Sequence, residues 1–226
     1  MYTRTIHDDI INKCFSGKAI ILYGPRQVGK TTLVKQIQTQ FINKTSLYLS
    51  GDDKETQEIL EPSLRSLRPM VMPYDLIIID EAQRIVDVGL IIKLLVDTFP
   101  EKQIIATGSS SFDLANKTSE PLTGRAYLYK LYPLSIEEIF PSEPLSSQLI
   151  QQRLLYGAYP DVVIPKHQSP EEYLSHLVEN YLYKDILIYD GIQKTHIITK
   201  ILQALALQIG SEFSYNEIAT TVGVDK

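Results

Sequence analysis

The run AIILYGPRQVGKTT, residues 19–32, restricts the fold of this chain more than any other feature. Its first five residues predict a short strand that is buried on both faces, and apolar residues at helical spacing predict a helix over 31–40. Between them lies the pattern G-x-x-x-x-G-K-[ST]. In that pattern backbone N–H groups cradle a polyphosphate, the lysine reaches the terminal phosphates and the hydroxyl ligates Mg²⁺. A glycine-rich turn with an incidental lysine is the alternative, but the strand before the pattern and the helix after it favour a phosphate-binding loop.

The loop and the first turn of its helix supply the expected nucleotide-binding residues. The N-terminus of the helix adds the positive end of its dipole to the cradle. We expect the side chain of Arg26 to point outward, because the neighbouring backbone faces the phosphates. The complete set is Gly24, Pro25, Arg26, Gln27, Val28, Gly29, Lys30, Thr31 and Thr32.

The segment LIIIDEAQ, residues 76–83, is the second motif. Four apolar residues followed by an aspartate place Asp80 at the carboxyl end of a buried strand, the end of a parallel sheet at which ligands bind. We interpret Asp80 and Thr31 as the Mg²⁺ ligands. Glu81 is then the base that deprotonates a water for attack on the γ-phosphate. A helix cap is the alternative role for these carboxylates, and the phosphate loop upstream favours the metal site.

Two further segments carry candidate catalytic groups. In TGSSS, residues 107–111, either Ser109 or Ser110 is expected to sense the γ-phosphate or to position the water, although a simple helix N-cap explains the same serines. Arg125 in LTGR precedes an expected strand. It either supplies charge to a phosphoryl-transfer transition state or is a surface arginine that pairs with a carboxylate.

The rest of the chain predicts an α/β fold with helices added at its end. Strand patterns cover 45–50, 74–80, 103–110 and 126–134, and helical patterns cover 6–15 and 87–99. Strands that alternate with helices predict a parallel sheet covered on both faces. Ser135 and Glu138 form a capping-box signature, and FPSEPLSS after them has the composition of a linker. Beyond it the patterns are helical only, over 146–156, 170–189 and 194–209.

Composition limits the number of domains, the binding partners and the cellular compartment that we expect. The 226 residues fit one large domain or one domain with a smaller attachment, and the net charge of −5 excludes a basic footprint over the whole chain. Cys14 is the single cysteine and has no internal disulfide partner, which suits a reducing cytosol. The N-terminus lacks a signal-peptide pattern and no run is long enough for a membrane span. The four histidines lack metal-ligand spacing. We expect a cytoplasmic protein.

Taken together, the motifs resemble those of bacterial and archaeal AAA-family P-loop ATPases that end in a C-terminal domain of unknown function and are related to STAND-type ATPases. The resemblance runs through GPRQVGKTT, LIIIDEAQ, TGSSS, LTGR and YPLSIEE, and continues in YGAYPDVV and YLYKDIL. It implies a P-loop NTPase fold of three α/β/α layers that binds ATP or ADP. It also implies an additional strand, carrying Ser109 and Ser110, between the phosphate-loop strand and the Asp80 strand.

The same resemblance places a G-x-P-like element, Gly157 to Pro160, near the adenine. Ala158 and Tyr159 depart from the residues that relatives often show there, and a helix stop is the alternative role for Pro160. The final segment SYNEIATTVGVDK resembles the first helix and turn of a helix-turn-helix. We therefore expect an ATPase domain over 1–140, a helical lid over 141–209, and an incomplete winged-helix segment, or merely a capping helix, over 210–226.

Two functions follow from these expectations. The first is a Mg²⁺-dependent ATPase that uses Lys30, Thr31, Asp80 and Glu81 and couples its nucleotide state to a protein or DNA partner, with an oligomer possible. The second is a switch that binds nucleotide, hydrolyses it negligibly and contacts DNA or protein through its C-terminal region. A small-molecule kinase is disfavoured, because a base beside the metal aspartate serves water better than a bound acceptor.

Overall fold

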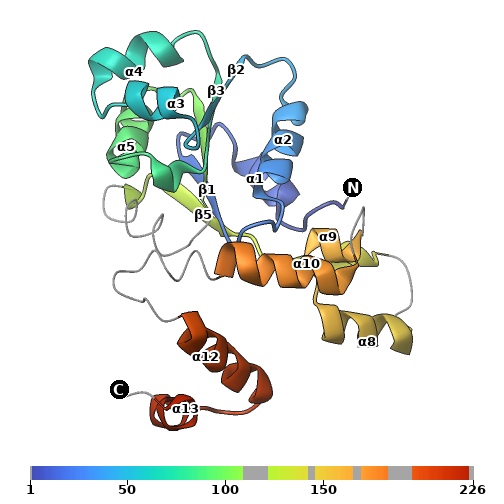
Figure 1. Ribbon diagram of the computed structural model, residues 1–226. Helices are drawn as coiled ribbons and strands as arrows, with labels where there is room; N and C mark the ends of the chain where they lie inside the picture. The colour runs from blue at the N-terminus through green and yellow to red at the C-terminus, as the bar shows by residue number, and fades with distance from the viewer. Residues whose placement is uncertain (1, 109–121, 142–145, 165–168, 183–194, 224–226) are drawn as a thin grey trace. The chain divides into compact units, whose positions relative to one another are not determined.

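The structure, a computed structural model, describes residues 2–108, 122–141, 146–164, 169–182 and 195–223 (Figure 1). The chain divides into two compact units, Met1–Ile164 and Pro165–Lys226. We call them the first and the second unit. The expected domain boundaries at 140/141 and 209/210 stay predictions.

The first unit is built on a five-stranded sheet in which all neighbouring strands are parallel. In spatial order its strands are β2 (Ser46–Ser50), β3 (Leu76–Asp80), β4 (Gln103–Gly108), β1 (Ala19–Tyr23) and β5 (Ala126–Lys130). This confirms the expected parallel sheet. The additional strand expected between the phosphate-loop strand and the Asp80 strand is β4. The carboxyl ends of the strands meet at one edge, where the loop after β1 begins.

Helices cover both faces of this sheet (Figure 1). On one face α1 (His7–Lys13) and α2 (Lys30–Gln40) share a buried cluster with Ile20, Leu22 and Ile78. On the other, α4 (Leu64–Val71) and α5 (Val88–Thr98) bury a cluster with Ile21 and Ile77, which Leu60 joins directly after α3 (Lys54–Ile59). Successive strand residues point to opposite faces, so strands buried on both faces are apolar throughout. The expected three-layer α/β/α fold is confirmed.

Residues 51–73 contain two helices that the sequence analysis did not predict. Asp53 begins α3 by accepting a hydrogen bond from the backbone N–H of Thr56, and Ser63 begins α4 by accepting one from Arg65. These N-cap residues were the available signal. Pro69 lies inside α4, and a proline within a helical pattern argues against a helix because it removes a backbone donor.

The segment after β5 runs past the carboxyl edge of the sheet. The expected strand over 126–134 ends at Lys130, because β1 beside it ends at Tyr23 and offers later residues no strand to pair with. The short helix α7 (Ile136–Ile139) then begins with the predicted capping box of Ser135 and Glu138. The first unit continues with α8 (Ser147–Tyr156) and α9 (Pro160–Val163).

The regular elements of the second unit, over its described residues, are helices joined by turns and loops. It contains α10 (Pro170–Leu177), which continues as a π-helical turn η2 (Val178–Leu182), then α12 (Thr195–Leu207) and α13 (Tyr215–Val222). Residues 183–189 of the expected helix over 170–189 lie outside the described residues. Helix α13 ends at Gly223, whose φ is 74°. One helix and the turn after it are therefore present, as the segment SYNEIATTVG predicts. Among the described residues, the helices fall short of the length and apolar character that a membrane crossing requires.

Candidate active site

The phosphate loop leaves β1 at Tyr23 and enters α2 at Lys30. Its first glycine is required by a close approach, since a Cβ atom on Gly24 would lie 2.1 Å from the carbonyl oxygen of Leu131. Its last glycine, Gly29, has a φ of 95° and precedes the first turn of α2, a conformation that glycine adopts without steric cost. The loop therefore turns sharply at both ends and leads directly into a helix N-terminus.

Lys30 is buried, and its ammonium group is folded onto the loop. Its Nζ donates to the carbonyl oxygens of Gly24 at 3.0 Å and Pro25 at 2.8 Å. Burial lowers the pKa of Lys30, the charge of Arg26 also lowers it, and Glu81 and Asp80 oppose the shift. The cation lies in a confined space where two carbonyl oxygens accept its hydrogen bonds, and phosphate oxygens are stronger acceptors.

Asp80, the last residue of β3, is the buried carboxylate of the site. The hydroxyl of Thr31 donates to its Oδ2 at 2.9 Å, so the structure brings the two expected metal ligands together. The hydroxyl of Tyr48 donates to the same Oδ2, and the hydroxyl of Thr107 donates to Oδ1. Each carboxylate oxygen has two lone-pair sites. Among the described residues, Oδ2 accepts from two hydroxyls, whereas Oδ1 accepts from one and keeps a lone pair that suits a cation or its water.

Tyr48 and Thr107 are site residues that the sequence analysis missed. Thr107 is fully buried on β4, two residues before Ser109, the first of the two candidate serines. Its signal was period-two alternation, which places it on the same face of the strand as Ile105. Tyr48 had no comparable signal, because its approach to Asp80 depends on β2 pairing with β3, with Ser50 opposite Asp80. Burial and the bond to Asp80 raise the pKa of the Tyr48 hydroxyl, so it remains a donor at neutral pH.

Glu81 follows directly and has an unusual backbone. Its φ of 49° and ψ of 42° are left-handed, a conformation that costs free energy in residues other than glycine and is frequent at functional sites. The Glu81 N–H donates to Thr107 Oγ1 at 3.2 Å, and Gln83 Nε2 donates to Glu81 Oε2 at 2.6 Å. These two hydrogen bonds restrain the expected base.

Arg125 corrects one of our predictions. β5 is parallel to β1, with Ala19 opposite Ala126, so the residue before β5 lies at the amino edge of the sheet, away from the phosphate loop. There Arg125 Nε forms an ion pair with Asp97 Oδ1 at 2.6 Å, and its carbonyl accepts from the N–H of Ala19 at 2.9 Å. The prediction that Arg125 lies near the nucleotide edge of its own chain is therefore wrong. The structure supports the alternative, a surface arginine that pairs with a carboxylate.

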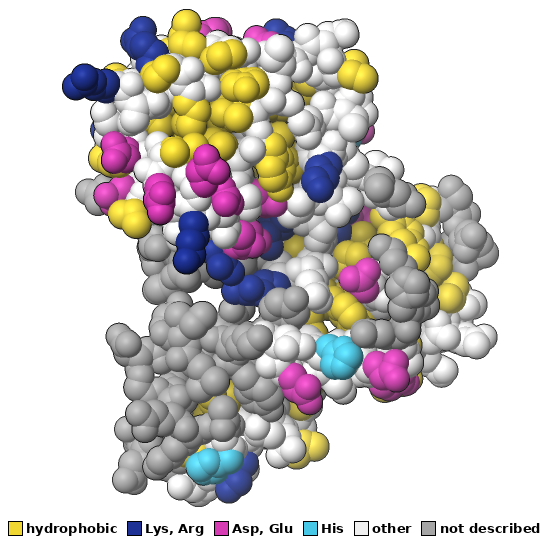
Figure 2. Space-filling view, turned by 45° about the horizontal axis from the view of Figure 1, so that its top comes forward, with side chains coloured by type: hydrophobic (Ala, Val, Ile, Leu, Met, Phe, Trp, Pro, Cys, Tyr) yellow, Lys and Arg dark blue, Asp and Glu magenta, His cyan; other side chains and the backbone are white. Residues whose placement is uncertain are grey.

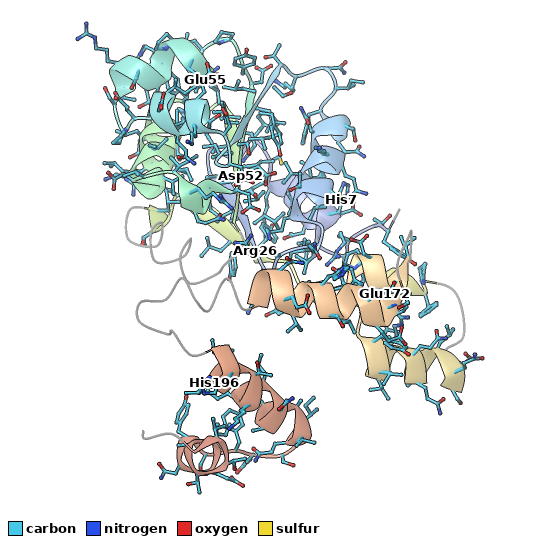
Figure 3. All side chains as sticks on the ribbon, in the orientation of Figure 1. His7, Arg26, Asp52, Glu55, Glu172 and His196 are labelled. Atoms are coloured by element: carbon cyan, nitrogen blue, oxygen red, sulfur yellow. The ribbon has the colours of Figure 1, made fainter. Side chains whose placement is uncertain are left out.

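The remaining expected residues fall into three groups. Ser109 and Ser110 lie outside the described residues. Pro160 is the first residue of α9, and Tyr159 before it packs against the apolar cluster that contains Val28. Arg26 is half-buried, and Figure 3 labels it together with Asp52 from the loop after β2.

The oxygen groups of Thr31 and Asp80 fit Mg²⁺, which is usually bound by one or two protein oxygens together with phosphate oxygens and water. Among the described residues, the structure contains no group of three or more histidine, cysteine or acidic side chains that could hold a metal ion alone. The oxygen atoms of Thr31 and Asp80 therefore suit a cation that is also bound by a polyphosphate.

Residues 16–140 match the family model of the AAA domain, and this match spans more than half of the chain. The chain belongs to the AAA domain family. Residues 147–226 match a second model, a domain of unknown function. The two matches confirm the resemblance found in the motifs, including its C-terminal part.

Curated relatives of this AAA protein are longer than the chain itself. An uncharacterized protein of Haemophilus influenzae is 27% identical over 222 residues, which cover 89% of this chain and 54% of the relative. One from Methanocaldococcus jannaschii is 27% identical over 247 residues and is covered to 52%. The chain thus spans about half the length of these relatives.

A solved structure shares the fold. The Walker-type ATPase of Pyrococcus abyssi superposes with a TM-score of 0.63 at 14% identity, and the match covers 99% of this chain and 88% of that one. At this identity the likeness supports the fold alone.

Proposed function

We propose that this AAA protein binds ATP at residues Gly24–Thr32 and hydrolyses it to ADP and phosphate with Mg²⁺. The observation that carries the proposal is the meeting of two segments. The 2.9 Å hydrogen bond from Thr31 to Asp80 sets the buried Lys30 ammonium and the Glu81 carboxylate at the same edge of the sheet. An anion cradle, a metal-binding pair and a base in this arrangement are the parts that phosphoryl transfer to water requires.

Binding begins with the phosphates at the N-terminus of α2. Backbone N–H groups of the loop donate to the phosphate oxygens, and the helix dipole favours their charge. Lys30 then exchanges the carbonyls of Gly24 and Pro25 for phosphate oxygens, a gain because a cation binds an anionic acceptor more strongly than a neutral carbonyl. Bound Mg²⁺ would neutralise charge on the phosphates beside Thr31 and Asp80.

Glu81 is proposed to accept the proton of the attacking water. Its carboxylate is restrained by Gln83, and its backbone by Thr107, so that its side chain leaves the end of β3 in a fixed direction. A fixed base of this kind contributes typically 10²- to 10⁴-fold to a hydrolytic rate.

A nucleotide-dependent switch with little hydrolysis is the second candidate, and one observation favours it. Arg125, the arginine expected to supply transition-state charge, lies at the opposite edge of the sheet. An arginine from a second copy of the chain would be needed in its place, which makes the rate of an isolated subunit low. For either function, we also propose that Ser109 or Ser110 senses the γ-phosphate. Pro160 is proposed to lie near the adenine.

The proposed partner is a protein or DNA, reached through the second unit. Supporting this idea, α13 and its Gly223 turn have the form of the first half of a helix-turn-helix. The face drawn in Figure 2 mixes acidic with basic side chains, and the net charge is −5. DNA binding would therefore need a local basic surface, and its affinity would fall with salt. A lid over 141–209 and a cytoplasmic location stay predictions.

The test combines nucleotide binding with phosphate release. Purified wild-type protein and Glu81→Gln are titrated with ATP, GTP and ADP, and phosphate release is measured with and without Mg²⁺ and duplex DNA. We expect both proteins to bind ATP, and Glu81→Gln to release phosphate at least about 100-fold more slowly. If both proteins bind ATP but release phosphate equally slowly, at the background level, the ATPase function is rejected and the nucleotide-dependent switch remains. Absence of binding in the folded wild type rejects both, and preference for GTP rejects the assignment of ATP.

A further inference from the structure

Arg4, near the N-terminus, is a buried cation outside the phosphate loop that contacts the loop backbone. Its exposed fraction is 7%. Its Nη1 donates to the carbonyl oxygen of Val28 at 3.3 Å, its Nη2 donates to the carbonyl oxygen of Tyr132, and its Nε lies 3.3 Å from Glu138 Oε1. One guanidinium group therefore joins the phosphate loop to the segment that follows β5.

The contact with Val28 matters because of peptide geometry. In a trans peptide unit the carbonyl and the following N–H point in opposite directions. A Val28 carbonyl held by Arg4 therefore turns the N–H of Gly29 away from Arg4. Gly29 has no Cβ and a φ of 95°, so the sequence itself restrains this peptide weakly. The hydrogen bond from Arg4 is an external contact that restrains its orientation.

Glu138 fixes Arg4 in turn. Its Oε1 accepts from the N–H of Thr5 at 2.8 Å and from the Thr5 hydroxyl at 3.1 Å, while its Oε2 accepts from the N–H of Ser135 at 3.0 Å. Glu138 thereby holds both the N-terminal segment and the start of α7. The YPLSIEE motif, whose function the nucleotide site alone leaves unexplained, contains these acceptors.

The same segment touches the site at two more points. Leu131 packs against Gly24, where a Cβ atom would be 2.1 Å from its carbonyl oxygen, and its N–H donates to Tyr23 O at 2.7 Å. The N–H of Leu134 donates to the carbonyl of Ala158 at 2.8 Å. Residues 131–138 thus connect the phosphate loop to the turn between α8 and α9.

Buried ion pairs are a costly means of joining segments, because desolvation offsets their attraction. Burial lowers the pKa of Arg4, and Glu138 opposes that shift. Well-packed apolar residues of similar volume often give equal or better stability. What they lack is a donor for the Val28 carbonyl.

We infer that Arg4, held by Glu138, is a positioning residue that presets the Val28–Gly29 peptide for phosphate binding and links the state of the loop to residues 131–138. The inference rests on the proposed nucleotide binding. Arg4 contacts the backbone of the loop, so it acts through the cradle and not on the phosphates themselves.

The test separates positioning from mere stability with two variants. Arg4→Gln removes the cation and leaves Glu138 as an uncompensated buried charge. Its amide nitrogen lies two bonds short of the Nη atoms, so the Val28 carbonyl loses the donor that Arg4 supplies. Arg4→Gln combined with Glu138→Gln removes both charges, while the carboxamide oxygen introduced by the second substitution keeps an acceptor for Thr5 or Ser135. Arg125→Gln, which breaks the surface pair with Asp97 at the far edge of the sheet, is the matched control. Melting temperature and ATP affinity by isothermal titration are measured for each.

We expect Arg4→Gln to lower both the melting temperature and the ATP affinity, the latter by about tenfold, the size of one lost charge-assisted hydrogen bond. The double variant regains melting temperature but not affinity, and Arg4→Lys regains little, since one ammonium group spans fewer of the three acceptors. Arg125→Gln binds ATP like wild type.

Two results overturn the inference. One is ATP affinity that recovers together with melting temperature in the double variant, which makes the pair purely structural. The other is wild-type affinity in a folded Arg4→Gln protein. Both require a wild type that binds ATP, and a folded wild type without ATP binding instead rejects the proposed function on which the inference rests.

Discussion

The hydroxyl of Thr31 donates to Asp80 Oδ2 over 2.9 Å, although 49 positions separate the two residues in the chain. The contact exists because α2 starts at the carboxyl end of β1 and β3 ends at the same edge, with β4 between them. The hydroxyl directs its O–H toward the carboxylate, which leaves the lone pairs of the Thr31 oxygen facing away from Asp80. This orientation would suit Thr31 to the proposed role of a Mg²⁺ ligand.

Lys30→Ala is expected to abolish measurable nucleotide binding, with a loss of at least about 100-fold in affinity, or about 2.7 kcal/mol. The reason is that the ammonium at the loop is replaced by a methyl group, while the phosphates keep their charge. Isothermal titration with ATP measures the effect. Lys35→Ala, an exposed position on the same helix, serves as control. Unchanged affinity in Lys30→Ala would remove this lysine from the site.

Thr107→Val is expected to lower the free energy of unfolding by about 1–3 kcal/mol, since valine has nearly the same shape but leaves the buried Asp80 without one donor. The Glu81 N–H also loses its acceptor. We therefore expect kcat for phosphate release to fall more than ATP affinity does. Denaturant unfolding and steady-state phosphate release measure the two effects.

Thr39→Val on the exposed side of α2 is the matched control for Thr107, because its hydroxyl also donates a local hydrogen bond, to Gln36 O at 2.7 Å. Loss of rate in both variants would point to a general effect of removing a hydroxyl. Loss of neither stability nor rate in Thr107→Val would mean that the contact with Asp80 has no energetic weight.

Tyr48→Phe is expected to lower the Mg²⁺ concentration required for tight ATP binding by a few-fold. Without the tyrosine hydroxyl, Asp80 Oδ2 accepts only from Thr31 and regains a lone pair for a cation or its water. A fluorescent ATP analogue titrated at increasing Mg²⁺ measures the requirement without reference to turnover. Tyr132→Phe, at an exposed ring, is the control. A higher Mg²⁺ requirement in Tyr48→Phe would show instead that the hydroxyl orients the carboxylate for the cation.

Local sequence was sufficient for the parts of this fold that depend on one segment. AIILY, with its phosphate loop, and SIEE, with its capping box, lie where their patterns predict, because burial on both faces and cap chemistry are local properties. The pairing of Thr31 with Asp80 was also accessible, since parallel strands bring their carboxyl ends to one edge.

Features that depend on how distant segments assemble could not be predicted from local sequence. The misplaced Arg125 shows this, because its edge of the sheet follows from β5 being parallel to β1, which the residues of LTGRAYLYK do not specify. Tyr48 reaches Asp80 only because β2 pairs with β3. Arg4 approaches Val28 through a contact over 24 positions, for which a single sequence has no pattern.

Gly51→Ala tests how closely the loop after β2 packs against the end of β3, which carries the proposed base. A Cβ atom there would lie 2.2 Å from the carbonyl oxygen of Glu81, and the Gly51 N–H donates to Asp80 O at 2.7 Å. Neither backbone can yield without moving the other, so we expect a loss of about 1–3 kcal/mol in the free energy of unfolding. Displacement of Glu81 should reduce phosphate release beyond any change in ATP affinity.

Gly124→Ala separates this clash from the general cost of replacing glycine. Gly124 has a φ of 76° and open space around the added Cβ, so alanine there meets only left-handed backbone strain, about 1–2 kcal/mol. It lies at the amino edge of the sheet, next to Arg125, and its phosphate release should stay at the wild-type rate. Equal rates in Gly51→Ala and Gly124→Ala would mean that the loop after β2 tolerates the methyl group without moving Glu81.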